Sequence, residues 1–128
     1  MKILLDTCTF LWLINDAQEL SESAKNLFQD TNNPIFLSSV SVWEIVVKNQ
    51  LGKLPLPEAP EQFIYESCEK HLIENIPLNN EAIFHLTNLP NYHRDPFDRM
   101  LVCQAIEHDL TLLTSDKLIT QYPVKTAW

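Results

Sequence analysis

The stretch Lys2-Ile3-Leu4-Leu5-Asp6-Thr7 shows the pattern from which the fold of this 128-residue chain can be predicted. Its first four residues form a short apolar run typical of a buried strand, an acid follows at once, and helical spacing begins at Thr7. Similar apolar runs at Pro34–Leu37 and Thr111–Leu113 are also followed by polar junctions and helical patterns. Such alternation is typical of a mainly parallel sheet with helices on both faces. The sequence therefore predicts an α/β fold.

The rest of the chain continues the alternation. A helix is predicted to open in the serine-rich turn at residues 38–41, with Ser41 as a capping residue, and to end at Gly52. No internal repeat and no linker interrupts the pattern, so we expect a single domain over residues 1–128 with four or five strands. The other predicted helices lie at 7–15, 21–30, 60–70, 79–86 and 97–108, with a helical turn at 117–121. The two remaining predicted strands lie at 72–77 and 124–128.

Composition excludes several classes of protein. The chain is 45% hydrophobic and 20% charged, which is ordinary for a globular domain and not for a disordered one. A single glycine, Gly52, excludes both the P-loop and the dinucleotide-binding motif, which need several glycines close together. No apolar run approaches the roughly 18 residues of a membrane span, and Asp6 follows too early for a signal peptide. We therefore expect a cytoplasmic protein with no membrane partner.

The charge balance limits how this chain can bind nucleic acid. Seventeen acids against nine bases give a formal net charge of −8. Proteins that bind nucleic acid through charge alone are usually basic. A nucleic-acid role would therefore require a bound metal ion or a local basic patch.

Four acids lie just beyond predicted strands or at the start of predicted helices: Asp6, Glu44, Asp98 and Asp116. In a doubly wound parallel sheet, ligands bind at the carboxyl ends of the strands, and chain reversals bring such residues to one edge. Carboxylate oxygens without a cluster of cysteine or histidine suit hard cations such as Mg²⁺ or Mn²⁺. We therefore expect a shared metal-binding crevice.

Helix capping offers a competing interpretation of each acid. Ser41-Val42-Trp43-Glu44 fits a capping box, and Asp95-Pro96-Phe97-Asp98 offers an N-cap, a proline at the first helical position and an acid at the third. Acids at helix starts are also favoured by the helix dipole. One metal pocket explains four such acids more simply than four independent caps. For Asp95 the capping role is sufficient, and it stays only a possible additional site residue.

Ordered motifs along the chain carry a resemblance to a known family. These are Leu4-Leu5-Asp6-Thr7, Ser41-Val42-Trp43-Glu44-Ile45, the stretch His93-Arg94-Asp95-Pro96-Phe97-Asp98-Arg99-Met100-Leu101, and Leu113-Thr114-Ser115-Asp116. Together they resemble the successive motifs of PIN domains, and most closely those of the VapC-like toxins of bacterial type II toxin–antitoxin systems. The resemblance extends over the whole chain, and its most specific part is the motif from His93 to Leu101.

This resemblance implies a three-layer α/β/α fold and a Mg²⁺- or Mn²⁺-dependent endoribonuclease. The active-site positions of the family fall on Asp6, Glu44, Asp98 and Asp116, whereas Asp95 matches a subfamily feature. Many relatives carry a further acid or aromatic residue where this chain has Leu118-Ile119, so no fifth metal ligand is expected there. Relatives form homodimers and bind an antitoxin, which implies both partners here.

A division of roles follows from the chemistry of phosphodiester hydrolysis, which needs an activated water and neutralisation of phosphoryl charge. We assign Asp6, Asp98 and Asp116 to the metal, and Glu44 either to the metal or to the attacking water. A rim of basic residues is expected to contact RNA phosphates, with Arg99 alternatively pairing with a carboxylate. Its candidates are Lys48, Arg94, Arg99 and Lys117.

Two other functions are compatible with parts of the pattern. A receiver-type signalling domain also holds Mg²⁺, but it needs paired acids after the first strand, where this chain has only Asp6. A PIN-fold binding module without catalysis would not need all four acids. His93 is interpreted as a structural loop histidine rather than an RNA contact. Surplus apolar residues, among them Trp12, Leu13 and Val47, predict an exposed patch for a partner helix.

Overall fold

A five-stranded, all-parallel sheet forms the centre of the protein in a computed structural model that describes residues 1–128. The neighbouring strands follow the order β3-β2-β1-β4-β5, so the first strand lies in the middle. The strands are β1 (Ile3–Leu5), β2 (Ile35–Ser38), β3 (Ile73–Ile76), β4 (Thr111–Leu113) and β5 (Thr126–Ala127).

Six α-helices and two short 3₁₀ helices connect these strands. Parallel neighbours require crossover connections, and the helices supply them. They are α1 (Thr7–Ile14), α2 (Glu22–Gln29), α3 (Ser39–Gln50), α4 (Pro60–Lys70), α5 (Asn80–Phe84) and α6 (Pro96–His108), with the 3₁₀ helices η1 (His85–Asn88) and η2 (Ile119–Gln121).

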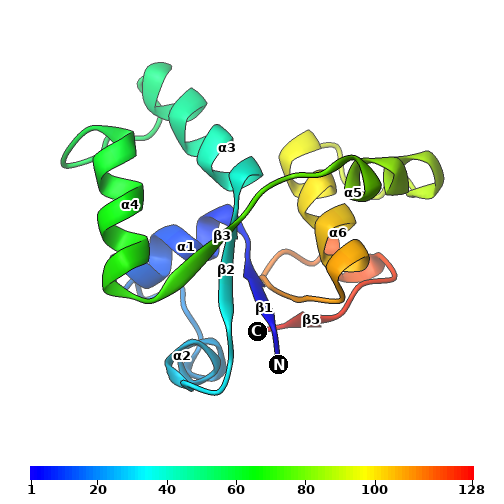
Figure 1. The fold of residues 1–128 in the computed structure, drawn as a ribbon, viewed down its shortest axis with the longest axis horizontal. Helices are drawn as coiled ribbons and strands as arrows, with labels where there is room; N and C mark the ends of the chain where they lie inside the picture. Colours follow the sequence, from blue (N-terminus) through cyan, green and yellow to red (C-terminus); the bar gives the residue numbers. More distant parts are fainter.

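The helices form a layer on each face of the sheet (Figure 1). Helices α1 to α4 lie on one side, and α5 and α6 on the other. Two hydrophobic cores lie on opposite faces of the sheet, the first beneath α1 to α4 and the second beneath α6. Because side chains alternate along a strand, Ile3 and Leu5 pack into the first core, whereas Leu4 packs into the second. All three are fully buried, as both faces of a covered parallel sheet require.

The strand order creates a switch point between β1 and β4. From β1 the chain builds outward to β2 and β3, and then crosses to the other side of β1 to add β4 and β5. The register pairs Leu5 with Leu113, so these two central strands end side by side. Residues that follow them are therefore brought together at one edge.

The predicted α/β class with three layers is confirmed, and the sheet has five strands, all of them parallel. The predicted start of the helix after β2 is wrong. No serine-rich turn separates β2 from α3, because α3 begins at Ser39 directly after the strand. The N-cap is Ser38, whose hydroxyl accepts the Val40 N–H at 2.9 Å, and Ser41 lies buried inside the helix.

The apolar residues predicted to form an exposed patch are half-buried or buried. Leu13 is buried in the first core, while Trp12 and Val47 are half-buried. The ring of Trp12 packs against that of Trp128, with the ring centroids 5.8 Å apart.

The helices are too short or too polar for any of them to span a lipid bilayer.

Candidate active site

A small polar cavity of about 270 Å³ opens at the carboxyl ends of β1 and β4. Its walls come from α1, α3, α6 and the segment after β4, so residues far apart in sequence share it. All four acids singled out from the sequence line this cavity, and Asp95 does too. The lining residues are Asp6, Thr7, Cys8, Trp12, Glu44, Lys48, Asp95, Asp98, Ser115 and Asp116.

Asp6 joins β1 to α1 and uses both carboxylate oxygens. Oδ1 accepts the Thr9 N–H at 2.7 Å and caps α1, and Oδ2 accepts the hydroxyl of Thr114 at 2.5 Å. Burial raises the pKa of Asp6 above its ordinary value, while these hydrogen bonds act in the opposite direction. The capping interpretation is therefore correct for Asp6, and the same carboxylate also faces the cavity.

Glu44 lies in the second turn of α3, so it caps nothing, and the capping-box interpretation is wrong. The carboxylate is buried and held by two partners. Thr7 donates its hydroxyl to Glu44 Oε1 at 2.7 Å, and Lys48, one turn further along α3, pairs with Oε2. Thr7 also contacts the hydroxyl of Ser41 at 2.9 Å. These contacts fix the position of Glu44 at the wall of the cavity.

Asp95 and Asp98 occupy the first turn of α6 but differ in their bonding. Asp95 is the N-cap, and its Oδ1 accepts the Phe97 N–H at 2.8 Å. The carboxylate of Asp98 accepts no hydrogen bond, and its one ion-pair contact is His93 Nε2 at 3.3 Å. Burial, followed by the charges of Asp95 and Asp6, raises the pKa of Asp98 to about 7.

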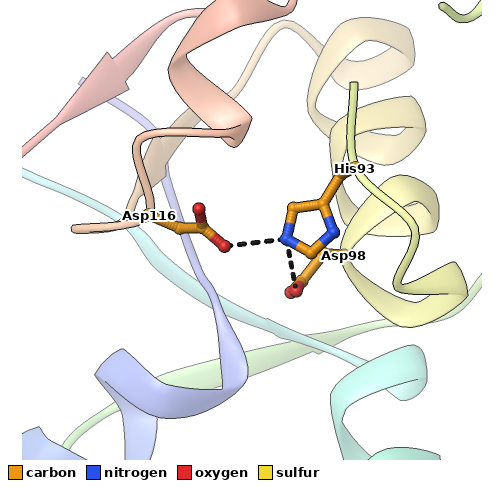
Figure 2. Close-up of side chains that lie close together, drawn as sticks. All are labelled: His93, Asp98 and Asp116. Atoms are coloured by element: carbon orange, nitrogen blue, oxygen red, sulfur yellow. Dashed lines mark hydrogen bonds and ion pairs between the residues drawn. The ribbon is translucent and has the colours of Figure 1, made fainter. Parts of the chain in front are cut away.

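Asp116 and Asp98 both face one nitrogen of the His93 ring, Nε2 (Figure 2). Nε2 of His93 lies 2.8 Å from Asp116 Oδ2, and the other oxygen of Asp116 accepts the Leu118 N–H at 2.9 Å. Potential ligand atoms of His93, Asp98 and Asp116 all lie within 4.8 Å of one another. This close group shares Asp98 and Asp116 with the set expected from the sequence, but it contains His93 where that set has Asp6.

Of the basic residues expected to form a phosphate-binding rim, only Lys48 lines the cavity. Its pKa is raised, chiefly by the hydrogen bond with Glu44. Arg99 pairs with no carboxylate. Its Nη1 instead donates to the Pro90 carbonyl at 2.9 Å and to the Tyr122 hydroxyl at 3.3 Å. Arg94 and Lys117 are exposed and lie outside the lining.

Three residues outside the four-acid set hold the acids in place: Thr7, Thr114 and His93. The role of Thr114 and the contact between His93 and Asp116 were not predicted from the sequence. Thr114 directly follows β4, and Thr7 follows β1 after Asp6, so their position near strand ends was a usable signal. The motif from His93 to Leu101 marks this histidine, but its contact with Asp116 could not be predicted, because it joins residues 23 positions apart. Only the folded arrangement of the loop before α6 and the segment after β4 reveals that contact.

Comparisons with known proteins agree with this architecture. The family model described as the PIN domain matches residues 3–125. Ribonuclease VapC16 of Mycobacterium tuberculosis is 38% identical over 48 residues, a match that covers 38% of this chain and only 34% of that relative.

Similar solved structures share the fold at low sequence identity. They include VapBC2 from Rickettsia felis bound to a promoter DNA fragment (TM-score 0.72, 18% identity, covering 99% of this chain and 98% of that one). DNA-bound VapBC from Salmonella typhimurium has a TM-score of 0.70 at 18% identity, covering 99% and 97% of the two chains. Since the family model spans nearly all of the sequence and the acids of its ordered motifs line one cavity, this chain belongs to the PIN domain family.

Proposed function

We propose that this protein is a metal-dependent endoribonuclease that hydrolyses RNA phosphodiester bonds. One observation carries the proposal. Asp6, Glu44, Asp98 and Asp116 come from four separate parts of the chain and line one cavity of about 270 Å³. Acids this close repel one another, so an arrangement that collects them is favoured when a cation is bound between them.

The donor set fits Mg²⁺ or Mn²⁺. All four acids offer hard oxygen ligands, which suit these cations. Asp98 gives the clearest indication, because its mostly buried carboxylate accepts no hydrogen bond and its pKa is raised to about 7. A divalent cation would supply the missing positive charge. We assign Asp6, Asp98 and Asp116 as the residues that would hold it.

A bound divalent cation lowers the pKa of water and neutralises the charge of phosphoryl oxygens. The remaining work falls to the side chains of this chain. Glu44, fixed by Thr7 and Lys48, is placed to orient the attacking water and accept its proton. Lys48 provides a positive charge in the cavity wall that can contact a phosphate. Arg94 and Lys117 are proposed as outer phosphate contacts.

The biological setting proposed for this activity is that of a toxin. The motifs resemble VapC-like toxins, a ribonuclease named VapC16 is a partial relative, and solved VapBC assemblies share the fold. We accordingly propose an antitoxin protein as partner, a homodimer as the assembly, and the cytoplasm as the site of action. An antitoxin that covered the cavity would block access of RNA to the acids.

The alternative is a PIN-fold module that binds a partner without catalysis. A cleavage assay on a panel of structured RNAs distinguishes the two. We expect cleavage with Mg²⁺ or Mn²⁺, none with EDTA, and none with the Asp98→Asn variant. His85→Ala is the matched control, because His85 pairs with Glu107 away from the cavity. Cleavage that persists in EDTA or in Asp98→Asn would contradict the proposed activity.

A further inference from the structure

The loop between η1 and α6 brings a histidine into the cluster of acids. His93 is mostly buried, with 12% of its side chain exposed, and its Nε2 lies 2.8 Å from Asp116 Oδ2 and 3.3 Å from Asp98 Oδ2. Figure 2 shows both carboxylates facing this one ring nitrogen. A histidine in this position either is a metal ligand itself or holds the ligands in place, and the two roles require different protonation of Nε2.

The hydrogen bonds of the ring decide between these roles. The backbone N–H of Asp95 donates to Nδ1 of His93 at 3.0 Å, so Nδ1 is the acceptor and carries no proton. A neutral imidazole with an unprotonated Nδ1 carries its proton on Nε2. That nitrogen then donates to Asp116 and has no lone pair left for a metal ion.

The loop that carries His93 is itself fixed. The backbone N–H of His93 donates to the hydroxyl of Tyr122 at 2.9 Å, and Tyr122 is buried. Arg99 Nη1 donates to the same hydroxyl at 3.3 Å and to the Pro90 carbonyl at 2.9 Å. The ring is thus held from its backbone as well as from Nδ1, which a positioning role needs.

We propose that His93 is a positioning residue of the metal centre rather than a ligand. Its Nε2–H holds the Asp116 carboxylate, which lies on an irregular segment after β4, beside Asp98 on α6. Asp98 has no other ion-pair partner, and the Asp116 carboxylate is otherwise bound only by the Leu118 N–H. The inference rests on the proposed metal-dependent function and assigns a residue that the four-acid set does not include.

The test measures Mn²⁺ binding in the absence of RNA, by electron paramagnetic resonance of the free ion, for the full chain and three variants. His93→Ala removes the donor, and we expect its Mn²⁺ dissociation constant to rise about tenfold or more, as loss of such supporting partners usually causes. His93→Gln retains a side-chain N–H and is expected to restore most of the affinity. His85→Ala, the same change outside the cavity, should bind like the wild type.

Pulsed paramagnetic resonance of the bound Mn²⁺ adds a readout that a general structural defect would not change. We expect no directly coordinated nitrogen in the wild type. A coordinated nitrogen that disappears in His93→Gln would overturn the inference, since it would show that His93 is a ligand. Affinity in His93→Ala equal to or tighter than wild type would also overturn it, as would a Gln variant as weak as Ala.

Two further comparisons separate a failure of the inference from misfolding of a variant and from a failure of the proposed function. If His93→Ala does not fold, Tyr122→Phe removes the hydroxyl that anchors the loop, and an unchanged Mn²⁺ affinity in Tyr122→Phe overturns the inference. If the wild-type protein does not bind Mn²⁺, the proposed metal-dependent function fails and the inference fails with it. Binding by the wild type with no loss in His93→Ala contradicts the inference alone.

Discussion

Asp98 differs from the other acids of the cavity in how little holds it. The carboxylates of Asp6 and Glu44 are each held by two contacts, either hydrogen bonds or an ion pair. The carboxylate of Asp98 has only the contact with His93. Its pKa is raised to about 7, first by burial and then by the charges of Asp95 and Asp6. The charged form of Asp98 therefore opposes folding of the metal-free protein.

We predict that Asp98→Asn raises the melting temperature of the metal-free protein. The gain should be largest at about pH 8 and shrink as the pH falls through about 7. The sign follows because the folded pKa lies above the ordinary value of 3.8, so wild-type Asp98 takes up a proton as the pH falls and loses its penalty. Thermal unfolding in EDTA at several pH values measures this. A lower melting temperature for Asp98→Asn at pH 8 would contradict it.

At the scale of elements, most strands and helices followed from hydrophobic spacing, because both faces of the sheet are covered and each helix buries an apolar side. The start of α3 did not. Three serines at 38, 39 and 41 all suit a cap, and only the end of β2 at Ser38 selects among them. Residues 79–86 were predicted as one helix, but the structure divides this region into α5 and the 3₁₀ helix η1.

The first turn of α6 combines a cap with a wall of the cavity, and substitutions at Asp95 separate the two roles. Asp95→Ala should be less stable than Asp95→Asn by about 1 kcal/mol, because only Asn retains an oxygen for the Phe97 N–H. Comparing these two variants removes the effect of the lost charge, which is common to both. Urea unfolding measures the difference. Equal stability of the two variants would show that the cap contributes nothing.

An RNA cleavage assay tests the other role of Asp95, as a wall of the cavity. Cleavage retained by Asp95→Asn would mark Asp95 as structural.

For the whole molecule, the strand order determines which parts of the chain meet. The acids could be predicted to share an edge because the carboxyl ends of parallel strands lie together. Their individual contacts could not, since Thr114 with Asp6 joins residues 108 positions apart, and His93 with Asp116 depends on a loop without regular structure. A net charge of −8 also gives no general attraction to RNA, so the proposed RNA binding would depend on the cavity and a cation bound there.

A crystal structure of the protein soaked with Mn²⁺ tests the central claim most directly, because anomalous scattering locates the ion without reference to activity. We predict one strong peak in the cavity, about 2.0–2.3 Å from oxygens of at least two of Asp6, Asp98 and Asp116. Asp98→Asn, soaked in the same way, should show a weaker peak or none. An ordered cavity with no peak at saturating Mn²⁺, or a peak bound only outside these acids, would contradict the account.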